Sequence, residues 1–534
     1  MGPDQSVVSP LRHRGYVASG MDPAHPEPRE LTINPSLWMA TSEWAERPVL
    51  RGDMSVQAVV VGAGITGLTA ARLLCEQGLT VAVIESRRVC SGVTGLTTAK
   101  VTALQSTIYT ELSERWGEET SAAYAAANLK GLEMIRGRAQ DDHIGCDMRI
   151  APALTYAETS GGLAKIEAEV ESAQRAGLGV SFTTESDLPF EIAGAARLEN
   201  QAQFHPRNYC LGLVRGILAD GGAVFEETRA IDLDATAGKV VTDGGTVSAE
   251  VIVVASHIPF VDTSGYFARM TPSRSYAVAF RSPGEPPTGM YISVDHPIRS
   301  IRSTGDGYTI VGGEAHPAGA DVDTEDRYGA LASWSQDRFR VSEVDYRWSA
   351  QDYRSVDGLP FVGPLGSSGR VYLATGFAKW GMANGTVAAA IMVDLAMGRG
   401  NPLASVFDSK RSPLKHAAPG LLKAGAGFAK NLLTGRVLPS DLSGLEHVEP
   451  GSGDVVSIDG HKAAAFRDDD GAVHAVSPIC THRGCQVQFN NAERTWDCPC
   501  HGSRFDVEGK VIHGPAVRDL EPVDERAMPR SSPG

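Results

Sequence analysis

Two continuous apolar runs, at residues 58–61 and 81–84, flank a glycine turn and a helical stretch near the start of the chain. Runs of this length that are bounded by turn residues are typical of strands buried on both faces of a sheet. A strand, a tight turn, a helix and a second strand predict the beginning of an α/β domain. Further apolar runs at 251–255 and 371–374 extend the same pattern.

The C-terminal part has a different pattern. From about Glu446 to Met528, short apolar stretches alternate with turn signals at Asp459-Gly460, Asp470-Gly471 and Glu508-Gly509. Pairs of this kind favour tight turns between short strands. We therefore expect a small all-β domain at residues 446–528.

The rest of the chain divides by composition. Residues 1–35 carry proline and charge without a periodic apolar pattern, which predicts a disordered N-terminal extension. Residues 36–400 form the α/β part, and residues 401–445 form a linker that is locally basic. A basic, weakly amphipathic stretch could touch a membrane surface. Its glycines weaken a free-standing helix, so we favour a helix that packs on the acidic α/β part and do not expect membrane contact.

Overall charge limits the partners. The chain has 49 basic and 64 acidic residues and a net charge of −15, so we expect no nucleic-acid partner. No apolar run is long enough to span a bilayer, and the first 30 residues lack a signal-peptide core, which predicts a cytoplasmic protein. Four scattered cysteines are expected to be reduced thiols: Cys75, Cys90, Cys146 and Cys210.

The first strand, turn and helix carry the glycine pattern of a dinucleotide site. Gly62 permits the tight turn, Gly64 allows a pyrophosphate to approach the backbone, and Gly67 lets the helix pack closely on the sheet. The N-terminus of the helix attracts phosphate groups. Glu85 ends the second strand, where an acid binds the hydroxyl groups of a ribose. A chance glycine turn is the alternative interpretation.

Three later segments decide which dinucleotide binds. Residues 91–100, 347–360 and 371–382 resemble the flavin-contacting segments of the D-amino acid oxidase and glycine oxidase superfamily. The resemblance covers roughly Ser36 to Gly400. It implies an FAD-binding domain of the glutathione-reductase-like α/β type with an interleaved α+β substrate domain, at about 111–199 and 266–342.

The resemblance also implies roles for individual residues. The turn from Gly376 to Gly381 is expected at a helix N-terminus that points at the flavin, where Lys379 adds charge or is simply solvated. With Trp380 and Arg302, Lys379 is a candidate catalytic residue, whereas His257 and His205 are expected to be structural. The backbone at Ala230 and Ile231 is expected to lie along the adenine. The implied FAD-binding set is Gly62, Gly64, Ile65, Thr66, Gly67, Glu85, Thr94, Thr98, Ala230, Ile231, Gly376, Phe377, Gly381 and Met382.

The substrate site is less determined by sequence. Arg274, Arg299 and Arg302 are candidates to hold a substrate carboxylate, although an arginine on a strand is usually just solvated. Tyr276 and Tyr291 could line the pocket. Cys90 lies near the expected flavin segment, where an unreacted thiol is favoured over covalent attachment of FAD.

Two short runs near the C-terminus supply metal ligands. Cys480 and His482 stand in the first, and Cys498 and His501 stand in the second. Two thiolates on one iron and two imidazoles on the other make a Rieske 2Fe–2S centre, whereas a zinc site is the alternative for paired Cys and His. The runs resemble the signature of respiratory and ferredoxin-like Rieske proteins. That resemblance favours an electron-transfer domain over an oxygenase.

Further features follow from the Rieske resemblance. Cys485 and Cys500 are expected to form a disulfide that joins the two ligand loops, and Gly514-Pro515-Ala516 resembles the loop that shields the cluster. Ser503 stands where high-potential members donate a hydroxyl, but Phe505 replaces a tyrosine donor. Fewer hydrogen bonds to sulfur lower the reduction potential. We therefore predict a potential in the lower part of the Rieske range.

These features together predict an FAD-dependent oxidoreductase. The combination with a C-terminal Rieske domain resembles bacterial flavoproteins of the gamma-glutamylputrescine oxidoreductase type. It implies oxidation of an amine or amino acid, with electrons passed to the cluster and then to a one-electron acceptor protein or a quinone. Two alternatives stay open. In one, a donor protein feeds electrons through the cluster to reduce a substrate, and in the other the chain is a non-catalytic redox sensor.

Overall fold

The computed structural model describes residues 34–262, 264–412, 444–458 and 460–523. The predicted N-terminal extension and most of the predicted basic linker lie outside these residues, as does the end of the predicted C-terminal domain. The described part of the linker, residues 401–412, is folded onto the α/β domain. The Arg411 side chain is 8% exposed, and its guanidinium pairs with the fully buried Asp357 at 2.8 Å and covers the ring of Phe361. The described part of the linker therefore packs on the α/β domain.

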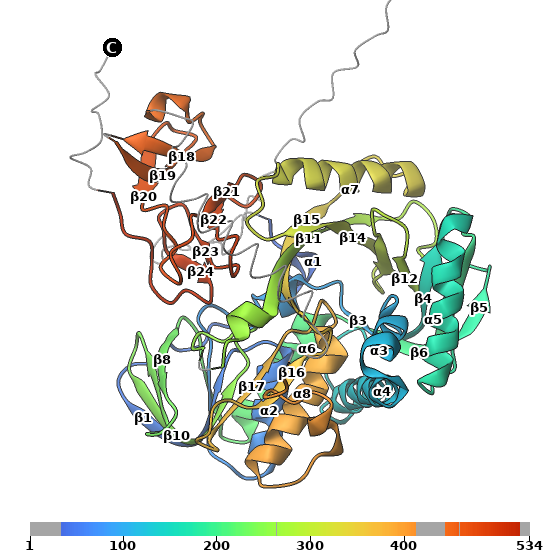
Figure 1. Cartoon of the computed structure of the whole chain (residues 1–534), viewed down its shortest axis with the longest axis horizontal. Coiled ribbons are helices and arrows are strands. Elements are labelled where there is room, and N and C mark those ends of the chain that lie inside the picture. The colour runs from blue at the N-terminus through green and yellow to red at the C-terminus, as the bar shows by residue number, and fades with distance from the viewer. Residues whose placement is uncertain (1–33, 263, 413–443, 459, 524–534) are drawn as a thin grey trace, which may run out of the picture.

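The first sheet is the α/β core that the apolar runs predict. Its strand order is β16, β17, β10, β1, β2, β7, with a hairpin of β8 and β9 at its side. Strands β17, β10, β1, β2 and β7 are parallel neighbours. Helices α2, α6 and α8 lie beside this sheet in the lower half of Figure 1. The bounds are β1 Met54–Val61, α2 Ile65–Glu76, β2 Val81–Ile84, α6 Pro206–Ala219, β7 Ala223–Phe225, β8 Ala230–Asp234, β9 Lys239–Thr242, β10 Thr246–Val254, β16 Phe361–Pro364, β17 Val371–Thr375 and α8 Gly381–Ala396.

The second sheet is larger and mixed. Its order is β15, β11, β14, β13, β12, β4, β6, β3, with β5 paired to β6. It lies in the upper right of Figure 1, where α7 runs above it. The bounds are β3 Lys100–Val101, α3 Ile108–Trp116, α4 Glu118–Asp141, β4 Arg149–Ala157, α5 Leu163–Arg175, β5 Ser181–Thr183, β6 Gly194–Gln203, β11 Met270–Arg281, β12 Met290–Ser293, β13 Ser300–Ser303, β14 Tyr308–Pro317, α7 Thr324–Phe339 and β15 Tyr346–Ser355.

This sheet extends beyond the two predicted substrate segments. Strand β15 lies after residue 342 and pairs with β11 along ten residues, from Tyr346 to Ser355. The sequence assigns this stretch to the flavin-contacting segments and does not predict that it is a strand of the substrate sheet. Both descriptions hold, because one edge strand can pair with the sheet and still face the cofactor cavity.

The C-terminal domain consists of two small antiparallel sheets. One contains β18, β19 and β20, and the other contains β21, β22, β23 and β24. This domain stands at the upper left of Figure 1, beside β11 and β15. Gly471 and Gly509 have positive φ angles of 89° and 83°, as the predicted turns require. The bounds are β18 Gly453–Ile458, β19 His461–Arg467, β20 Val473–Val476, β21 Gln488–Asn490, β22 Thr495–Asp497, β23 Arg504–Phe505 and β24 Val511–His513.

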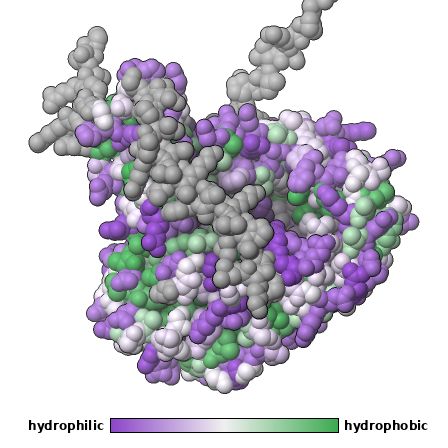
Figure 2. All heavy atoms as spheres, viewed as in Figure 1, coloured by the Kyte–Doolittle hydropathy of each residue, from purple (hydrophilic) through white to green (hydrophobic). Residues whose placement is uncertain are grey.

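Hydrophilic residues cover most of the face in Figure 2, interrupted by small hydrophobic patches. Among the helices of the described residues, none has the length and apolar character needed to cross a bilayer. The cytoplasmic location stays a prediction.

Candidate functional site

The glycine turn after β1 has the geometry that a pyrophosphate cradle needs. Gly62 has a φ of 107°, and a Cβ atom there would lie 2.5 Å from the carbonyl oxygen of Ala255. A Cβ atom on Gly67 would lie 1.9 Å from the carbonyl oxygen of Gly62, so only glycine lets α2 approach the turn. Gly64 is the N-cap of α2 and has no side chain to occupy the helix N-terminus. The backbone N–H groups of this turn can therefore bind phosphate.

A single large cavity runs from this turn into the substrate sheet. Its volume is about 1830 Å³, which is large enough for a dinucleotide together with a small substrate. Glu85 lines it and accepts a hydrogen bond from the N–H of Ala63 at 2.8 Å. The predicted FAD-binding residues that line this cavity are Gly62, Gly64, Ile65, Thr66, Glu85, Thr94, Thr98, Ala230, Phe377, Gly381 and Met382.

Three members of the predicted set do not line the cavity. Gly67 and Gly376 are required by the backbone geometry instead. Gly67 permits α2 to pack closely against the turn, and Gly376 has a φ of 80°, which favours glycine. Ile231 is 37% exposed and does not line the cavity. The predicted contact of this segment with the adenine is made by the backbone, so it stays a prediction.

The turn before α8 forms part of the cavity wall. Ala378 and Lys379 both adopt positive φ angles, of 52° and 73°, and α8 begins at Gly381. Lys379 and Trp380 line the cavity. Lys379 is an exposed residue of the cavity wall.

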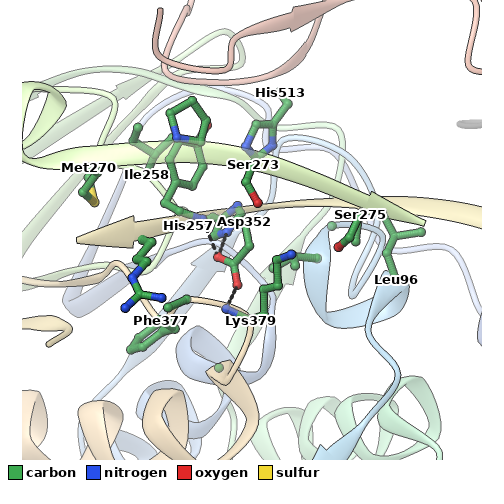
Figure 3. A pocket seen from close by; sticks show the side chains of 18 of the residues that line it. Leu96, His257, Ile258, Met270, Ser273, Ser275, Asp352, Phe377, Lys379 and His513 are labelled. Carbon is green, nitrogen blue, oxygen red and sulfur yellow. Dashed lines mark hydrogen bonds and ion pairs between the residues drawn. The ribbon is translucent and has the colours of Figure 1, made fainter. Parts of the chain in front are cut away.

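No sequence motif marks the carboxylate that holds this turn in place, which is Asp352. Asp352 on β15 accepts hydrogen bonds from the N–H of Lys379 and from Nε2 of His257, the latter at 2.8 Å. Figure 3 shows Asp352 between these two residues, with His513 above His257. His257 contacts the rings of Tyr353 and His513 at centroid distances of 4.8 and 5.3 Å. The expected structural role of His257 is consistent with these contacts.

His205 also has the expected structural role. Its Nδ1 atom accepts a hydrogen bond from the N–H of Asn208 at 3.2 Å and caps the N-terminus of α6.

The structure places Arg302 away from the cavity. It is 1% exposed, lies outside the cavity lining, and donates to the carbonyl oxygens of Thr98, Ala99 and Phe204 at 3.1–3.2 Å. These bonds join the predicted flavin segment to the substrate sheet, which is a structural role.

Arg299 and Arg274 also differ from the prediction, because each pairs with a protein carboxylate. Arg299 bonds Glu314 at 2.7 Å, and Arg274 bonds Asp497 at 3.0 Å. Of the two tyrosines, Tyr276 lines the cavity and Tyr291 does not.

A lysine takes the place that we expected an arginine to occupy. Lys100 lines the cavity, and its ammonium group donates to the carbonyl oxygen of Tyr291 and, at 2.7 Å, to Oγ of Ser300. Burial lowers its pKa well below the usual value, and Arg302 adds to this effect. Both hydrogen-bond partners are neutral, so an anion in the cavity would stabilise the charged form.

The two metal-binding loops have the same backbone shape. In each, the first cysteine donates its N–H to a carbonyl oxygen five residues later at 2.8 Å, from Cys480 to Cys485 and from Cys498 to Ser503. In each, a glycine with positive φ donates back to the first cysteine, namely Gly484 and Gly502. The repeated geometry presents one cysteine and one histidine from each loop to a common point.

The ligand set fits a Rieske cluster. The rings of His482 and His501 lie with centroids 5.0 Å apart, and the side chains of Cys480 and Cys498 are in hydrogen-bond contact. Both ring nitrogens of His482 are buried without a hydrogen-bond partner, and burial lowers its pKa to about 3. A neutral imidazole with an open nitrogen is the form that binds iron.

Cys485 and Cys500 form a disulfide between the two loops. The Sγ atoms of Cys485, Cys498 and Cys500 lie within 4.8 Å of one another, but two of them belong to this bond and are not available as ligands.

Residues of the C-terminal domain complete the wall of the flavin cavity. His501, Cys500 and His513 line the same cavity as Gly62 and Glu85. Phe267, which also lines the cavity, contacts the rings of His482 and His501 at centroid distances of 4.3 and 5.6 Å. The histidine side of the cluster site therefore faces the flavin cavity.

Comparison with protein families agrees with both halves of the chain. Residues 57–395 match the family described as FAD dependent oxidoreductase (DAO), and residues 442–524 match the Rieske 2Fe–2S domain. The chain is 36% identical over 504 residues to the Rieske 2Fe–2S iron-sulfur protein YhfW of Bacillus subtilis (strain 168), covering 91% of this chain and 97% of that protein. It is 24% identical to the gamma-glutamylputrescine oxidoreductase of Escherichia coli (strain K12), covering 69% of this chain and 90% of that enzyme.

Solved structures show the same fold in the first half. Glycine oxidase from Geobacillus kaustophilus aligns with a TM-score of 0.59 at 17% identity, over 67% of this chain and 99% of that one. L-proline dehydrogenase from P. horikoshii aligns with a TM-score of 0.56 at 16% identity, over 68% and 98% of the two chains. The predicted fold class is confirmed, as are the two cofactors, FAD and a 2Fe–2S cluster. The chain belongs to the DAO family of FAD-dependent oxidoreductases and carries a Rieske domain at its C-terminal end.

Proposed function

We infer that this oxidoreductase removes a hydride from the carbon beside the nitrogen of an amine or amino acid, and that the electrons leave through the Rieske centre. The observation that supports this inference is the single cavity of about 1830 Å³ lined by both domains. Gly62 and Glu85 at one wall belong to the FAD fingerprint, and His501 at another wall is a cluster ligand in the proposed set. A cluster that only stabilised the fold would have no reason to face this cavity.

The reaction balances as follows. The substrate loses a hydride from carbon and a proton from nitrogen, and the resulting imine is hydrolysed by water to a carbonyl compound and an amine or ammonia. When bound, FAD accepts two electrons and the cluster carries one electron at a time. The two electrons must therefore leave in two steps, either to two molecules of a one-electron acceptor protein or to one quinone, which also takes up two protons.

The substrate class follows from the polar groups of the cavity. Lys100 is a buried lysine beside the substrate strands whose charged form an anion would stabilise, and we assign it to a carboxylate of the substrate. The names of similar proteins support the same class, because they include glycine oxidase, L-proline dehydrogenase and L-amino acid deaminase. We expect Lys100→Met to raise the Kd of a carboxylate-bearing donor by about tenfold or more, as the loss of a charged hydrogen bond of about 1.5–3 kcal/mol requires. The Kd of the corresponding amine without a carboxylate should change little.

The test is an anaerobic titration of the purified protein with polyamines, amino acids and hydroxy acids. Flavin absorbance and the electron paramagnetic resonance (EPR) signal of the cluster are followed together. Bleaching of the flavin with appearance of a Rieske signal on addition of an amine or amino acid supports the proposal and identifies the donor class. If every donor fails while dithionite reduces both centres, the proposal is refuted, and a reductive or sensing role takes its place.

A further inference from the structure

Three consecutive residues of β15 contact elements of both cofactor sites. Because side chains alternate along a strand, Gln351 and Tyr353 point to one face and Asp352 to the other. Gln351 donates from Nε2 to the carbonyl oxygen of Gly502 at 2.7 Å, and Tyr353 donates from its hydroxyl to the carbonyl oxygen of His501 at 3.1 Å. Gln351 Nε2 also donates to the Tyr353 hydroxyl at 3.1 Å, which links the two contacts.

On the opposite face, Asp352 holds the flavin side of the cavity. It accepts hydrogen bonds from the N–H of Lys379 and from Nε2 of His257. Both of those residues line the cavity. One strand therefore binds the cluster loop on one face and the flavin-side turn on the other.

The contact between β15 and the cluster loop depends on glycine. A Cβ atom on Gly502 would lie 2.5 Å from Nε2 of Gln351 and 2.9 Å from the hydroxyl of Tyr353. Gly319, on the oxidoreductase side, approaches the loop in the same way, since a Cβ atom there would lie 2.5 Å from the nitrogen of Pro499. Two glycines, one from each domain, thus permit the cluster loop to lie against the oxidoreductase domain more closely than a side chain would allow.

The hydrogen bonds from Gln351 and Tyr353 to the cluster loop are shielded from water. Tyr353 is fully buried and Gln351 is 6% exposed. Water cannot easily replace a lost donor at such a site, so the backbone of the cluster loop would lose a hydrogen bond to β15. The ring of Tyr353 also packs near His257 and His513, contacts that a phenylalanine would keep.

We propose that Gln351 and Tyr353 are positioning residues that fix the cluster loop, and with it His501, at the wall of the flavin cavity. Asp352 fixes the opposing turn from the same strand, so the two redox centres keep one relative position. The consequence for electron transfer rests on the proposed function. Electron tunnelling slows steeply with distance, so release of the loop slows transfer from flavin to cluster while each centre stays bound.

The test compares Tyr353→Phe and the double variant Tyr353→Phe, Gln351→Leu with wild type. The control is Tyr372→Phe, because Tyr372 is a buried tyrosine that donates to the carbonyl oxygens of Gly369 and Leu395 within the oxidoreductase domain. Flash photoreduction with a deazaflavin, with EDTA as the sacrificial electron donor, reduces the flavin of the full chain. The first-order rate at which the cluster then gains its electron is recorded. The EPR g-values of the dithionite-reduced cluster are measured for each protein.

Loss of one neutral hydrogen bond changes an equilibrium by about twofold or more, so we expect transfer at least about twofold slower in Tyr353→Phe and slower again in the double variant. The g-values should shift in both, and Tyr372→Phe should match wild type in both measurements. If the double variant misfolds, Tyr353→Phe alone decides.

The positioning role is overturned if Tyr353→Phe keeps the wild-type g-values and transfers within about twofold of wild type, the smallest change that loss of one hydrogen bond should cause. If the wild-type flavin passes no electron to the cluster, the proposed function fails instead. In that case the g-values of the variants still decide the positioning role.

Discussion

Replacement of Asp497 by asparagine should strongly destabilise the Rieske domain and its contact with the substrate sheet. The Asp497 side chain is 4% exposed and bonds two guanidinium groups, from Arg274 across the domain boundary and from Arg504 within the domain, each at 3.0 Å. It also accepts from Asn490 at 3.1 Å and from Thr495 at 2.8 Å. Asparagine has nearly the same shape but leaves two buried cations without their counter-charge.

The magnitude follows from burial. Breaking a buried ion pair by removing one partner costs about 3–5 kcal/mol, because the remaining charge stays desolvated. Burial alone would raise the pKa of Asp497, but Arg504 and Arg274 outweigh it and hold the pKa well below its usual range. A lowered folded-state pKa gives stability that is present above the unfolded pKa and lost only as pH falls through the folded value. The difference between wild type and variant should therefore stay constant from about pH 5 to 8.

The assay is the thermal midpoint of loss of cluster absorbance at one heating rate, with iron content measured for each protein. At about 4–8 °C per kcal/mol for a small domain, we expect Asp497→Asn to lower the midpoint by at least about 10 °C. The control is Asp469→Asn, which breaks an ion pair with Arg494 in the same domain at 2.9 Å. Asp469 is 68% exposed, so this change should cost no more than about 1 kcal/mol. A midpoint for Asp497→Asn within about 3 °C of that control would refute the reasoning.

Three further predictions concern the flavin site, the fold and the cluster. Gly67→Ala should lose most of its bound FAD, measured as flavin absorbance per chain, because its Cβ atom would lie 1.9 Å from a carbonyl oxygen. The control Gly137→Ala, which has open space around the new Cβ atom, should keep FAD. Burial raises the pKa of Glu169 to about 7, so wild type should lose about 3 kcal/mol of stability relative to Glu169→Gln between about pH 4 and 8 in denaturant titrations. No such pH dependence would contradict the assignment. Phe505 is fully buried and has no donor, so the cluster potential should lie in the lower half of about −150 to +300 mV and rise in Phe505→Tyr, and a wild-type value near the top would be inconsistent.

Local motifs account for what the sequence could predict. The fingerprint from Gly62 to Glu85 lies within one strand, turn, helix and strand, so its geometry is determined by neighbours in the chain. The two cluster loops are equally local, since each closes on itself over six residues. Residue type and spacing are sufficient for features of this kind.

Long-range contacts account for what the sequence could not predict. Gln351 and Gly502 are 151 residues apart in the chain, and Arg274 and Asp497 are 223 apart. Nothing in the residues around Arg274 distinguishes an arginine that binds substrate from one that pairs across a domain boundary. The same holds for Arg302, because its carbonyl partners come from segments about 100 and 200 residues away.

Lys100 is a cavity residue that the sequence does not select as a candidate. It stands in the flavin segment by sequence, but its ammonium group bonds neutral groups of Tyr291 on β12 and Ser300 on β13, about 200 residues away in the chain. A buried ammonium group without a protein counter-ion is a property of the assembled fold, so no local pattern could have marked Lys100 as a candidate for the substrate carboxylate.

The most direct test of the account is the number of electrons that an amine or amino-acid donor delivers to one chain without oxygen. FAD takes two electrons and the cluster one, so complete reduction of both centres should consume about 1.5 equivalents of a two-electron donor. We predict this value, with flavin bleaching and the EPR signal of the reduced cluster both complete at the end point. An end point at about 1.0 equivalent, with bleached flavin and a cluster that still has no EPR signal, would contradict transfer from flavin to cluster.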